Sequence, residues 1–210
     1  MTNASGPPGG RKEQILVATA DLVARRGYHS VSIGDIGSAV GITGPGVYRH
    51  FESKSAVLVA LFDRVIDELL GNVAQILSRG ADEHEVLDEL VADQVRFALT
   101  KRFLIQVYLQ EITNLPDEDR RRLRRKQRRY LEEWVKVMSV LRPDATYQEA
   151  LSLVHAAISA IQSLVNYNSP LSPEQLKALM NNAAKALLET SIVCEIVPTG
   201  GRVQGVSASA

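Results

Sequence analysis

A short stretch near the N-terminus carries side chains that are suited to contacting DNA. Small residues let a helix backbone approach a duplex closely, while hydroxyl, phenol, imidazole and cationic groups reach phosphates or base edges. We therefore predict a nucleic-acid interface in this part of the chain. The candidate contact residues are Ser32, Thr43, Gly44, Gly46, Tyr48, Arg49, His50 and Lys54, together with Arg11 and Lys12.

Two short helices joined by a tight turn are expected to position these residues. Ser32 stands three residues before Asp35, which is the spacing of a capping box, and Gly41 ends this helix. Thr43 can cap the next helix, whose first turn holds Pro45, where a missing N–H costs nothing. This is the arrangement of a helix-turn-helix, whose second helix projects into a major groove.

Longer helices are predicted on both sides of this pair. Apolar residues recur at helical spacing from Arg11 to Arg26, just before a glycine, and indicate a first helix. The third helix is expected to end near Phe51. Ser53 can then cap a long helix that reaches roughly Arg79 and could connect two domains.

The rest of the chain is also helical in period, and no credible strand is found. Capping boxes at Thr146 with Glu149 and at Ser172 with Gln175 define the last two starts best. The fold class expected is all-α. The expected helices cover residues 84–100, 102–113, 117–141, 146–167 and 173–193.

This pattern divides the chain into four segments. Residues 1–10 are rich in Gly, Pro and Ser and are predicted to form a flexible arm, and residues 195–210 a disordered tail. Residues 11–53 form the predicted N-terminal three-helix DNA-binding domain, which contains the helix-turn-helix. Residues 54–194 form the predicted C-terminal helical domain for ligand binding and dimerisation.

The segment from Ser32 to Lys54 resembles the N-terminal signature of the TetR family of transcriptional regulators. An Asp-Ile pair, an Ala-x-Gly-Ile turn, a Tyr-x-x-Phe and a Ser-Lys follow one another in the family's order and spacing. The resemblance implies a dimeric repressor that binds double-stranded operator DNA. It also implies half-sites about one helical turn apart and release of the DNA when a small ligand changes the separation of the recognition helices.

Two departures from the family pattern concern glycines. Gly44 stands where many members carry a lysine, which implies fewer phosphate contacts. Gly34 and Gly37 lie inside the second helix, where each costs about 0.5–1 kcal/mol of helix stability relative to alanine. We expect Arg11 and Lys12 to compensate for the missing lysine by contacting the DNA backbone or the minor groove.

The resemblance also implies that the last two long helices pair with their copies in a second subunit, as a four-helix bundle. Small residues on these helices agree with a close helix approach, although they also suit an internal core of one subunit. The expected interface residues are Ala156, Ala160, Ser163, Leu164, Leu179, Ala183 and Leu187.

A ligand pocket is expected between the middle helices. Its predicted lining combines aromatic groups with a few polar ones. Each of these residues also has a plainer interpretation, as a core aromatic, a packing carboxylate or an interior or interface histidine. The candidate effector-binding residues are Phe97, Phe103, Gln106, Tyr108, Glu111, Trp134 and His155.

Eight cations occur among the ten residues from Arg120 to Arg129. A solvated helix face explains this run, and an anion site for the phosphates of a coenzyme A thioester is the functional alternative. The segment from Val107 to Leu115, followed by this run and Trp134, is similar to the acyl-CoA-responsive branch of the family. Drug-like or aromatic effectors remain alternatives.

Composition excludes other functions. The 24 basic and 24 acidic residues cancel, so any basic surface must be local, and the single Cys194 allows no internal disulfide. No catalytic, phosphate-loop or metal-ligand motif is found, so we expect neither an enzyme nor a metal or cofactor. No apolar run is long enough for a membrane span, and a cytoplasmic protein is expected. The alternative is a helical adaptor or ligand-binding protein that does not bind DNA.

Overall fold

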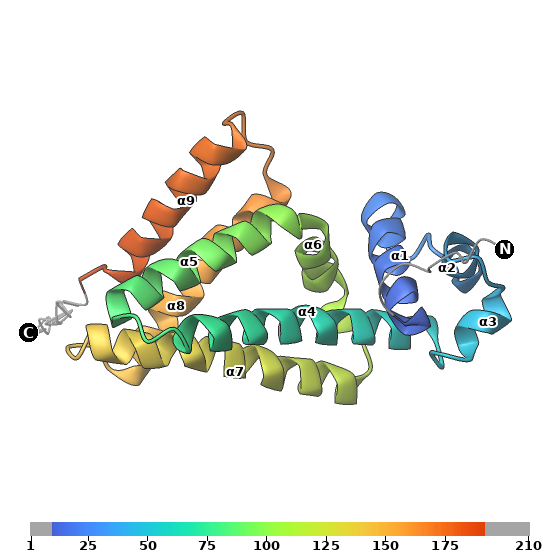
Figure 1. The fold of residues 1–210 in the computed structure, drawn as a ribbon, viewed down its shortest axis with the longest axis horizontal. Coiled ribbons are helices and arrows are strands. Elements are labelled where there is room, and N and C mark those ends of the chain that lie inside the picture. Colours follow the sequence, from blue (N-terminus) through green and yellow to red (C-terminus); the bar gives the residue numbers. More distant parts are fainter. Residues whose placement is uncertain (1–9, 192–210) are drawn as a thin grey trace, which may run out of the picture.

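The computed structural model describes residues 10–191, and this part of the chain is helical throughout (Figure 1). The N-terminal helices are α1 (Arg11–Arg26), α2 (Ile33–Ala39) and α3 (Gly44–Tyr48). The helices that follow are α4 (Lys54–Leu77), α5 (Glu83–Thr100), α6 (Arg102–Glu111), α7 (Asp117–Leu141), α8 (Tyr147–Gln162) and α9 (Pro173–Leu188). The short 3₁₀ turns η1 (Ile112–Asn114) and η2 (Ser163–Asn166) continue α6 and α8. The all-α prediction is confirmed.

Local capping explains most helix starts. Both hydrogen bonds of the predicted capping boxes form at Ser32, Thr146 and Ser172. At the start of α4, the Ser53 hydroxyl accepts a hydrogen bond from the backbone N–H of Ala56. Thr43 is the N-cap residue of α3, but its side chain makes no capping hydrogen bond. The hydroxyl of Thr43 therefore does not have the capping role that the sequence suggested.

The ends of four helices differ from the expected ranges. The third helix ends at Tyr48 rather than near Phe51, and the last described helix ends at Leu188. The ends of the expected helices 102–113 and 146–167 instead tighten into η1, at residues 112–114, and η2, at residues 163–166. Such tightening is common where a helix ends, because i to i+3 hydrogen bonds satisfy the last carbonyl groups.

The turn between α2 and α3 depends on two glycines. Gly41 has a φ of 70°, a left-handed conformation that a side chain would strain. A Cβ atom on Gly37 would lie 2.8 Å from the carbonyl oxygen of Ile42 and 3.0 Å from that of Thr43. The interior Gly37 is therefore required by the close approach of the turn backbone to α2.

Two hydrophobic cores fill the molecule. The DNA-side core, as we name the first, joins buried residues of α1, α2, α3 and the first half of α4 to Val107, Leu115 and Leu123. The effector-side core joins the second half of α4 to α5, α7, α8 and α9. The first core thus continues well beyond residue 53, into helices that follow the three N-terminal ones.

Helix α4 belongs to both cores and runs along the molecule from the α1–α3 end, with α7 beside it (Figure 1). Ion pairs link these two helices along their contact. Asp63 pairs with Arg122 and Lys126, and Asp67 pairs with Lys126 at 2.8 Å. Since α4 starts directly after the helix-turn-helix, a displacement of α4 would be passed to it.

No helix among residues 10–191 is long and apolar enough to cross a membrane. The predicted arm at residues 1–9 and tail at 195–210 lie outside the described residues.

Candidate DNA-binding face and effector cavity

The helix-turn-helix exposes a small polar face. The Tyr48 side chain is 54% exposed, Arg49 and Thr43 are exposed, and His50 is half-buried. Val47 of the same short helix is fully buried in the DNA-side core and holds α3 in place. The phenol, guanidinium and hydroxyl groups are therefore presented from a fixed backbone, as a DNA-contacting helix requires.

Gly44 and Gly46 differ in how closely their neighbours pack against them. A Cβ atom on Gly46 would lie 3.2 Å from the side chain of Ile42, and one on Gly44 would lie 3.8 Å from the backbone of Gly34. Gly44 therefore has room for a side chain, and Gly46 has little. The Ser32 side chain, also predicted to contact DNA, is occupied by the capping box with Asp35.

The cations of this region are largely engaged within the protein. The Arg11 guanidinium donates to the Val40 carbonyl at 3.0 Å, where it satisfies the C-terminal end of α2. Lys12 lies 5.9 Å from the centre of the Phe51 ring. Both residues remain exposed, so their predicted DNA contacts stay predictions.

Lys54, the first residue of α4, stacks its ammonium group 4.1 Å from the centre of the Tyr28 ring. Partial burial lowers the pKa of Lys54, and the carboxylates of Glu111 and Asp35 oppose this shift. The ammonium group thus connects the loop after α1 to the start of α4, in addition to its predicted role toward a phosphate.

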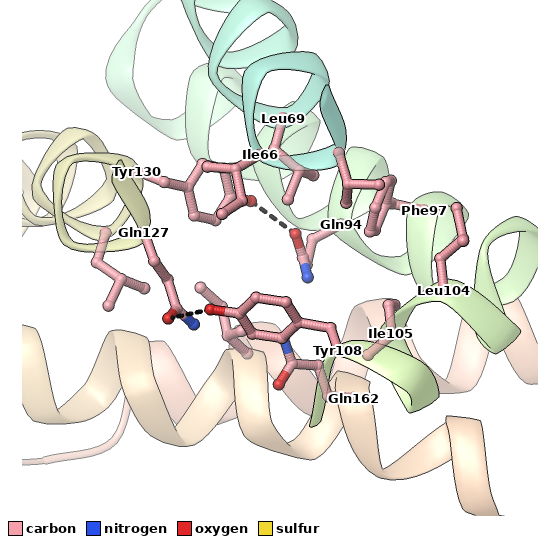
Figure 2. A pocket seen from close by; sticks show the side chains of 13 residues that line it. Ile66, Leu69, Gln94, Phe97, Leu104, Ile105, Tyr108, Gln127, Tyr130 and Gln162 are labelled. Atoms are coloured by element: carbon pink, nitrogen blue, oxygen red, sulfur yellow. Dashed lines mark hydrogen bonds between the residues drawn. The ribbon is translucent and has the colours of Figure 1, made fainter. Parts of the chain in front are cut away.

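A cavity of about 60 Å³, partly open to the surface, lies between the middle helices (Figure 2). Apolar side chains of α4, α5, α6, α7 and α8 form most of its wall, and neutral polar groups complete it. The lining residues are Val65, Ile66, Leu69, Gln94, Phe97, Leu104, Ile105, Tyr108, Gln127, Tyr130, Leu131, Ile158 and Gln162.

Two hydrogen bonds order the polar part of the cavity wall (Figure 2). The Tyr130 hydroxyl donates to Gln94 Oε1 at 2.6 Å, and the Tyr108 hydroxyl donates to Gln127 Oε1 at 3.0 Å. Burial raises the pKa of Tyr130 and of Tyr108, so both phenols keep their protons at neutral pH. The wall is therefore uncharged and suits a neutral, mostly apolar group.

A surface groove of about 420 Å³ adjoins the cavity and shares Gln127 and Leu131 with it. Arg124 and Arg128 of α7 line this groove. In addition, Arg124 opposes the rise in the pKa of Tyr108, which places its guanidinium within electrostatic range of the cavity wall. The other lining residues are Glu132, Tyr147, Gln148, Leu151 and His155.

The structure divides the cationic run of α7 into groups with different surroundings. Arg120, Arg122 and Lys126 form ion pairs with carboxylates of α7 or α4. With other described residues, the remaining arginines form no ion pair within 4.0 Å. Of these remaining residues, Arg124 and Arg128 line the groove, whereas Arg121 and Arg125 are exposed outside it.

The predicted effector residues are only partly brought together. Phe97 and Tyr108 line the cavity, and His155 lines the groove. Trp134 is fully buried in the effector-side core, and Phe103 is 56% exposed, so neither faces the cavity. Gln106, half-buried on α6, is also absent from its lining.

Glu111, predicted to bind effector, instead lies where the C-terminal helices meet the N-terminal ones. Glu111 is 6% exposed, and its carboxylate lies 3.4 Å from His29 Nε2 and accepts a hydrogen bond from Asn114. The plainer interpretation of this residue as a packing carboxylate fits its position. It connects α6 to the loop that follows α1.

Sequence reasoning missed the polar residues of the cavity wall, above all Gln94, Gln127 and Gln162. Gln94 carries one detectable signal, because this amide sits between apolar residues on the buried face of an amphipathic helix. A polar residue in such a position requires a partner or a ligand.

The predicted dimer residues mostly retain exposed surface. Leu179 is 52% exposed, and α9 buries only Ala184 and Leu188 within the chain. Ala156 and Ser163 are exposed, and Ala160, Ala183 and Leu187 are partly so. Leu164 differs, because it is 6% exposed and has little surface left for a partner.

Comparison with known proteins agrees with this architecture. Residues 15–61 match the family model of bacterial regulatory proteins of the tetR family, and residues 80–168 match a tetracyclin repressor-like C-terminal domain. The HTH-type transcriptional repressor KstR2 of Rhodococcus jostii (strain RHA1) is 28% identical over 111 residues, 53% of this chain and 54% of that protein. The match thus spans about half the length of this relative.

Solved structures share the fold over most of the chain. A TetR-family transcriptional regulator from Bordetella parapertussis 12822 superposes with a TM-score of 0.72 at 26% identity, covering 85% of this chain and 94% of that one. AibR, solved with isovaleryl coenzyme A and operator DNA, superposes with a TM-score of 0.71 at 20% identity, covering 83% and 97%.

A helix-turn-helix held in place by a buried core, followed by a helical domain with a cavity, is the architecture of a transcriptional regulator with a ligand-binding domain. The chain belongs to the TetR family of transcriptional regulators. Since this family consists of regulators, the expectation that the chain is not an enzyme is confirmed.

Proposed function

We propose that this protein is a homodimeric repressor that leaves a roughly palindromic operator when an acyl-CoA thioester binds. The acyl group enters the cavity, and the phosphates of coenzyme A occupy the groove lined by Arg124 and Arg128. The observation that carries this proposal is the junction of an uncharged cavity with an arginine-lined groove through Gln127 and Leu131.

The chemistry of the two compartments matches the two ends of such a thioester. The cavity offers apolar walls and neutral hydrogen-bonding groups, while guanidinium groups bind phosphate through short charge-assisted hydrogen bonds. AibR, which shares the fold, was solved in complex with isovaleryl coenzyme A. This likeness supports the class of effector.

The cavity is placed where a ligand can act on DNA binding. Ile66 belongs to the DNA-side core, Val65 and Leu69 pack against the effector-side core, and all of them line the cavity. Val65 lies eleven residues after Lys54, which is about 17 Å along an α-helix at 1.5 Å per residue. A ligand that separates the two cores would therefore tilt α4 and shift the recognition helices.

Dimerisation through α8 and α9 would present two recognition helices, one from each subunit, to a single operator. The uncovered face of α9, with Leu179 at its centre, supports this arrangement. We expect Leu179→Glu to produce a monomer in sedimentation velocity experiments. Leu171→Glu, at a residue that is 40% exposed in the loop before α9, is the matched control and should stay dimeric. A dimeric Leu179→Glu would contradict this interface.

DNA binding is tested with a duplex that the protein itself selects from a random-sequence pool. Tyr48→Ala and Arg49→Ala should each weaken binding by about tenfold in a gel shift, because a base contact is worth about 1–3 kcal/mol. Arg121→Ala on α7 serves as the control and should bind as the wild type does. Unchanged affinity in both helix-turn-helix variants would show that the assigned face is wrong.

The effector is tested by titrating butyryl-CoA and longer acyl-CoA thioesters into the protein–DNA complex. We expect the Arg124→Gln/Arg128→Gln variant to need at least tenfold more thioester for half-release, because hydrogen bonds to charged groups are worth about 1.5–3 kcal/mol. The matched variant Arg121→Gln/Arg125→Gln changes the net charge equally and should respond normally. An equal response to the free fatty acids would exclude coenzyme A as part of the effector.

A further inference from the structure

Gln94 of α5 has a donor group that the fold itself does not use. Its side chain is 1% exposed, and its Oε1 accepts the hydrogen bond from the Tyr130 hydroxyl. With described residues, its Nε2 group makes no hydrogen bond. Figure 2 shows this nitrogen on the cavity side of the amide, directed away from Tyr130. A polar N–H group that faces the cavity without a protein partner makes the cavity complementary to an acceptor.

The orientation of this amide is enforced by its neighbours. The Tyr130 hydroxyl donates to Gln94 Oε1 at 2.6 Å, which fixes the oxygen of the amide on the Tyr130 side, and burial raises the pKa of this phenol so that it keeps its proton. The nitrogen is thereby turned into the cavity, where the lining holds no carboxylate that could accept from it. No hydrogen bond joins this nitrogen to the amide or phenol oxygens of the described wall, so a ligand oxygen that enters the cavity can serve as its acceptor.

The position of Gln94 indicates which part of a bound thioester would carry the acceptor oxygen. Gln127 and Leu131 lie at the junction with the groove, whereas Gln94 lies on α5 and is not among the groove residues. A thioester whose phosphates occupy the groove would bring its carbonyl group first to the Gln127 and Tyr108 side. An oxygen on the acyl chain, beyond the thioester carbonyl, is then placed to accept from Gln94.

The volume limits the length of that chain. The cavity of about 60 Å³ is small beside the pockets of about 300–1,000 Å³ that hold drug-sized ligands. Longer chains require the walls of α4 and α6 to move apart. The resting cavity is therefore matched to a short group.

We propose that Gln94 makes this cavity selective for a short acyl group that carries a hydroxyl or oxo oxygen on its carbon chain. This inference rests on the proposed function, since it names the class of acyl group that the proposed effector site takes. The donor is the Gln94 amide, and the rest of the wall contacts the chain carbons.

Isothermal titration calorimetry on the full-length dimer tests this selectivity with three thioesters of equal chain length. These are butyryl-CoA, 3-hydroxybutyryl-CoA and acetoacetyl-CoA. The wild type should bind at least one of the two oxygenated esters about tenfold more tightly than butyryl-CoA, because that ester satisfies a buried donor. Gln94→Leu, of similar volume, should remove or reverse this preference while still binding butyryl-CoA.

Gln106→Leu is the matched control, because Gln106 lies on α6 but does not line the cavity. This variant should keep the wild-type preference. The comparison of ligands on the wild type needs no variant, so poor folding of Gln94→Leu would not prevent the test.

The outcomes separate this inference from the proposed function. If the wild type binds butyryl-CoA as tightly as both oxygenated esters, the role of Gln94 is wrong although the acyl-CoA proposal stands. If Gln94→Leu keeps the preference, another group reads the oxygen and the inference is also overturned. If the wild type binds none of these esters or their longer homologues, the acyl-CoA proposal fails, and this inference with it.

Discussion

The DNA-side core and the effector-side core meet along α4 but differ in how completely they are filled. Near the helix-turn-helix, packing is so close that a Cβ atom on Gly37 would lie 2.8 Å from a backbone oxygen. Where the two cores meet, a cavity of about 60 Å³ remains beside Ile66 and Leu69. Close packing transmits a displacement, whereas a cavity can be filled and so can originate one. The difference indicates which region responds to ligand and which passes the response on.

The largest expected effect comes from Phe62, which belongs to the DNA-side core and contacts Tyr108 edge to face at 5.0 Å. Phe62→Ala should lower the free energy of unfolding by about 3–5 kcal/mol. If α4 couples the cores, urea transitions followed by circular dichroism and by the fluorescence of Trp134, the only tryptophan, should shift together. Transitions that separate would show two independent cores. Phe103→Ala, at an exposed site, is the control.

Alanine substitutions of Gly37 and Gly34 test how closely the turn backbone packs against α2. Gly37→Ala forces a methyl group against the backbone of Ile42 and should cost about 1–3 kcal/mol of stability and weaken DNA binding. Gly34→Ala meets only the Ser32 hydroxyl, at 3.5 Å, and should stabilise α2 by about 0.5–1 kcal/mol. Urea denaturation of both variants measures the difference. Equal effects would show that the turn is not closely packed.

A larger side chain in the cavity should imitate the ligand. Leu69→Phe adds volume on α4 and should weaken binding to the selected duplex by about tenfold without any thioester, within the usual range of allosteric coupling of about 1–3 kcal/mol. Leu77→Phe, at an exposed position on the same helix, should bind DNA normally. Unchanged DNA affinity in Leu69→Phe would show that the cavity is not coupled to α4.

The smallest effect concerns acid stability at the start of α2. Hydrogen bonds from Ser32, with a smaller contribution from Arg26, lower the pKa of Asp35. Its carboxylate therefore stabilises the fold above the unfolded pKa of about 3.9, and this contribution is lost as the pH falls through the lower folded value. The difference in melting temperature between wild type and Asp35→Asn should shrink below about pH 4. A constant difference would contradict this role, and Asp21→Asn serves as the control.

Local features of the fold could be predicted from the sequence alone. The capping boxes at Ser32, Thr146 and Ser172 were predicted correctly because each depends on residues three positions apart. The left-handed turn at Gly41 likewise depends on its own backbone. The helix-turn-helix followed from these signals together.

The effector site was predicted less well because it depends on contacts between distant residues. Gln94 and Tyr130 are 36 positions apart and meet only when α5 packs against α7. An aromatic residue suits a pocket and a core equally, and for Trp134 the packing of the effector-side core decided between the two.

The helix-turn-helix, the all-α class and the family were determined by the sequence alone, since short-range spacing and capping specify them. Tertiary structure decided what the arginines of α7 do and where the cavity lies. The arginines of α7 lie in solvent, against Asp63 of α4 or in the groove, depending on which helix packs beside each of them. Only the folded arrangement of α4, α7 and α8 therefore distinguishes Arg122 from Arg124.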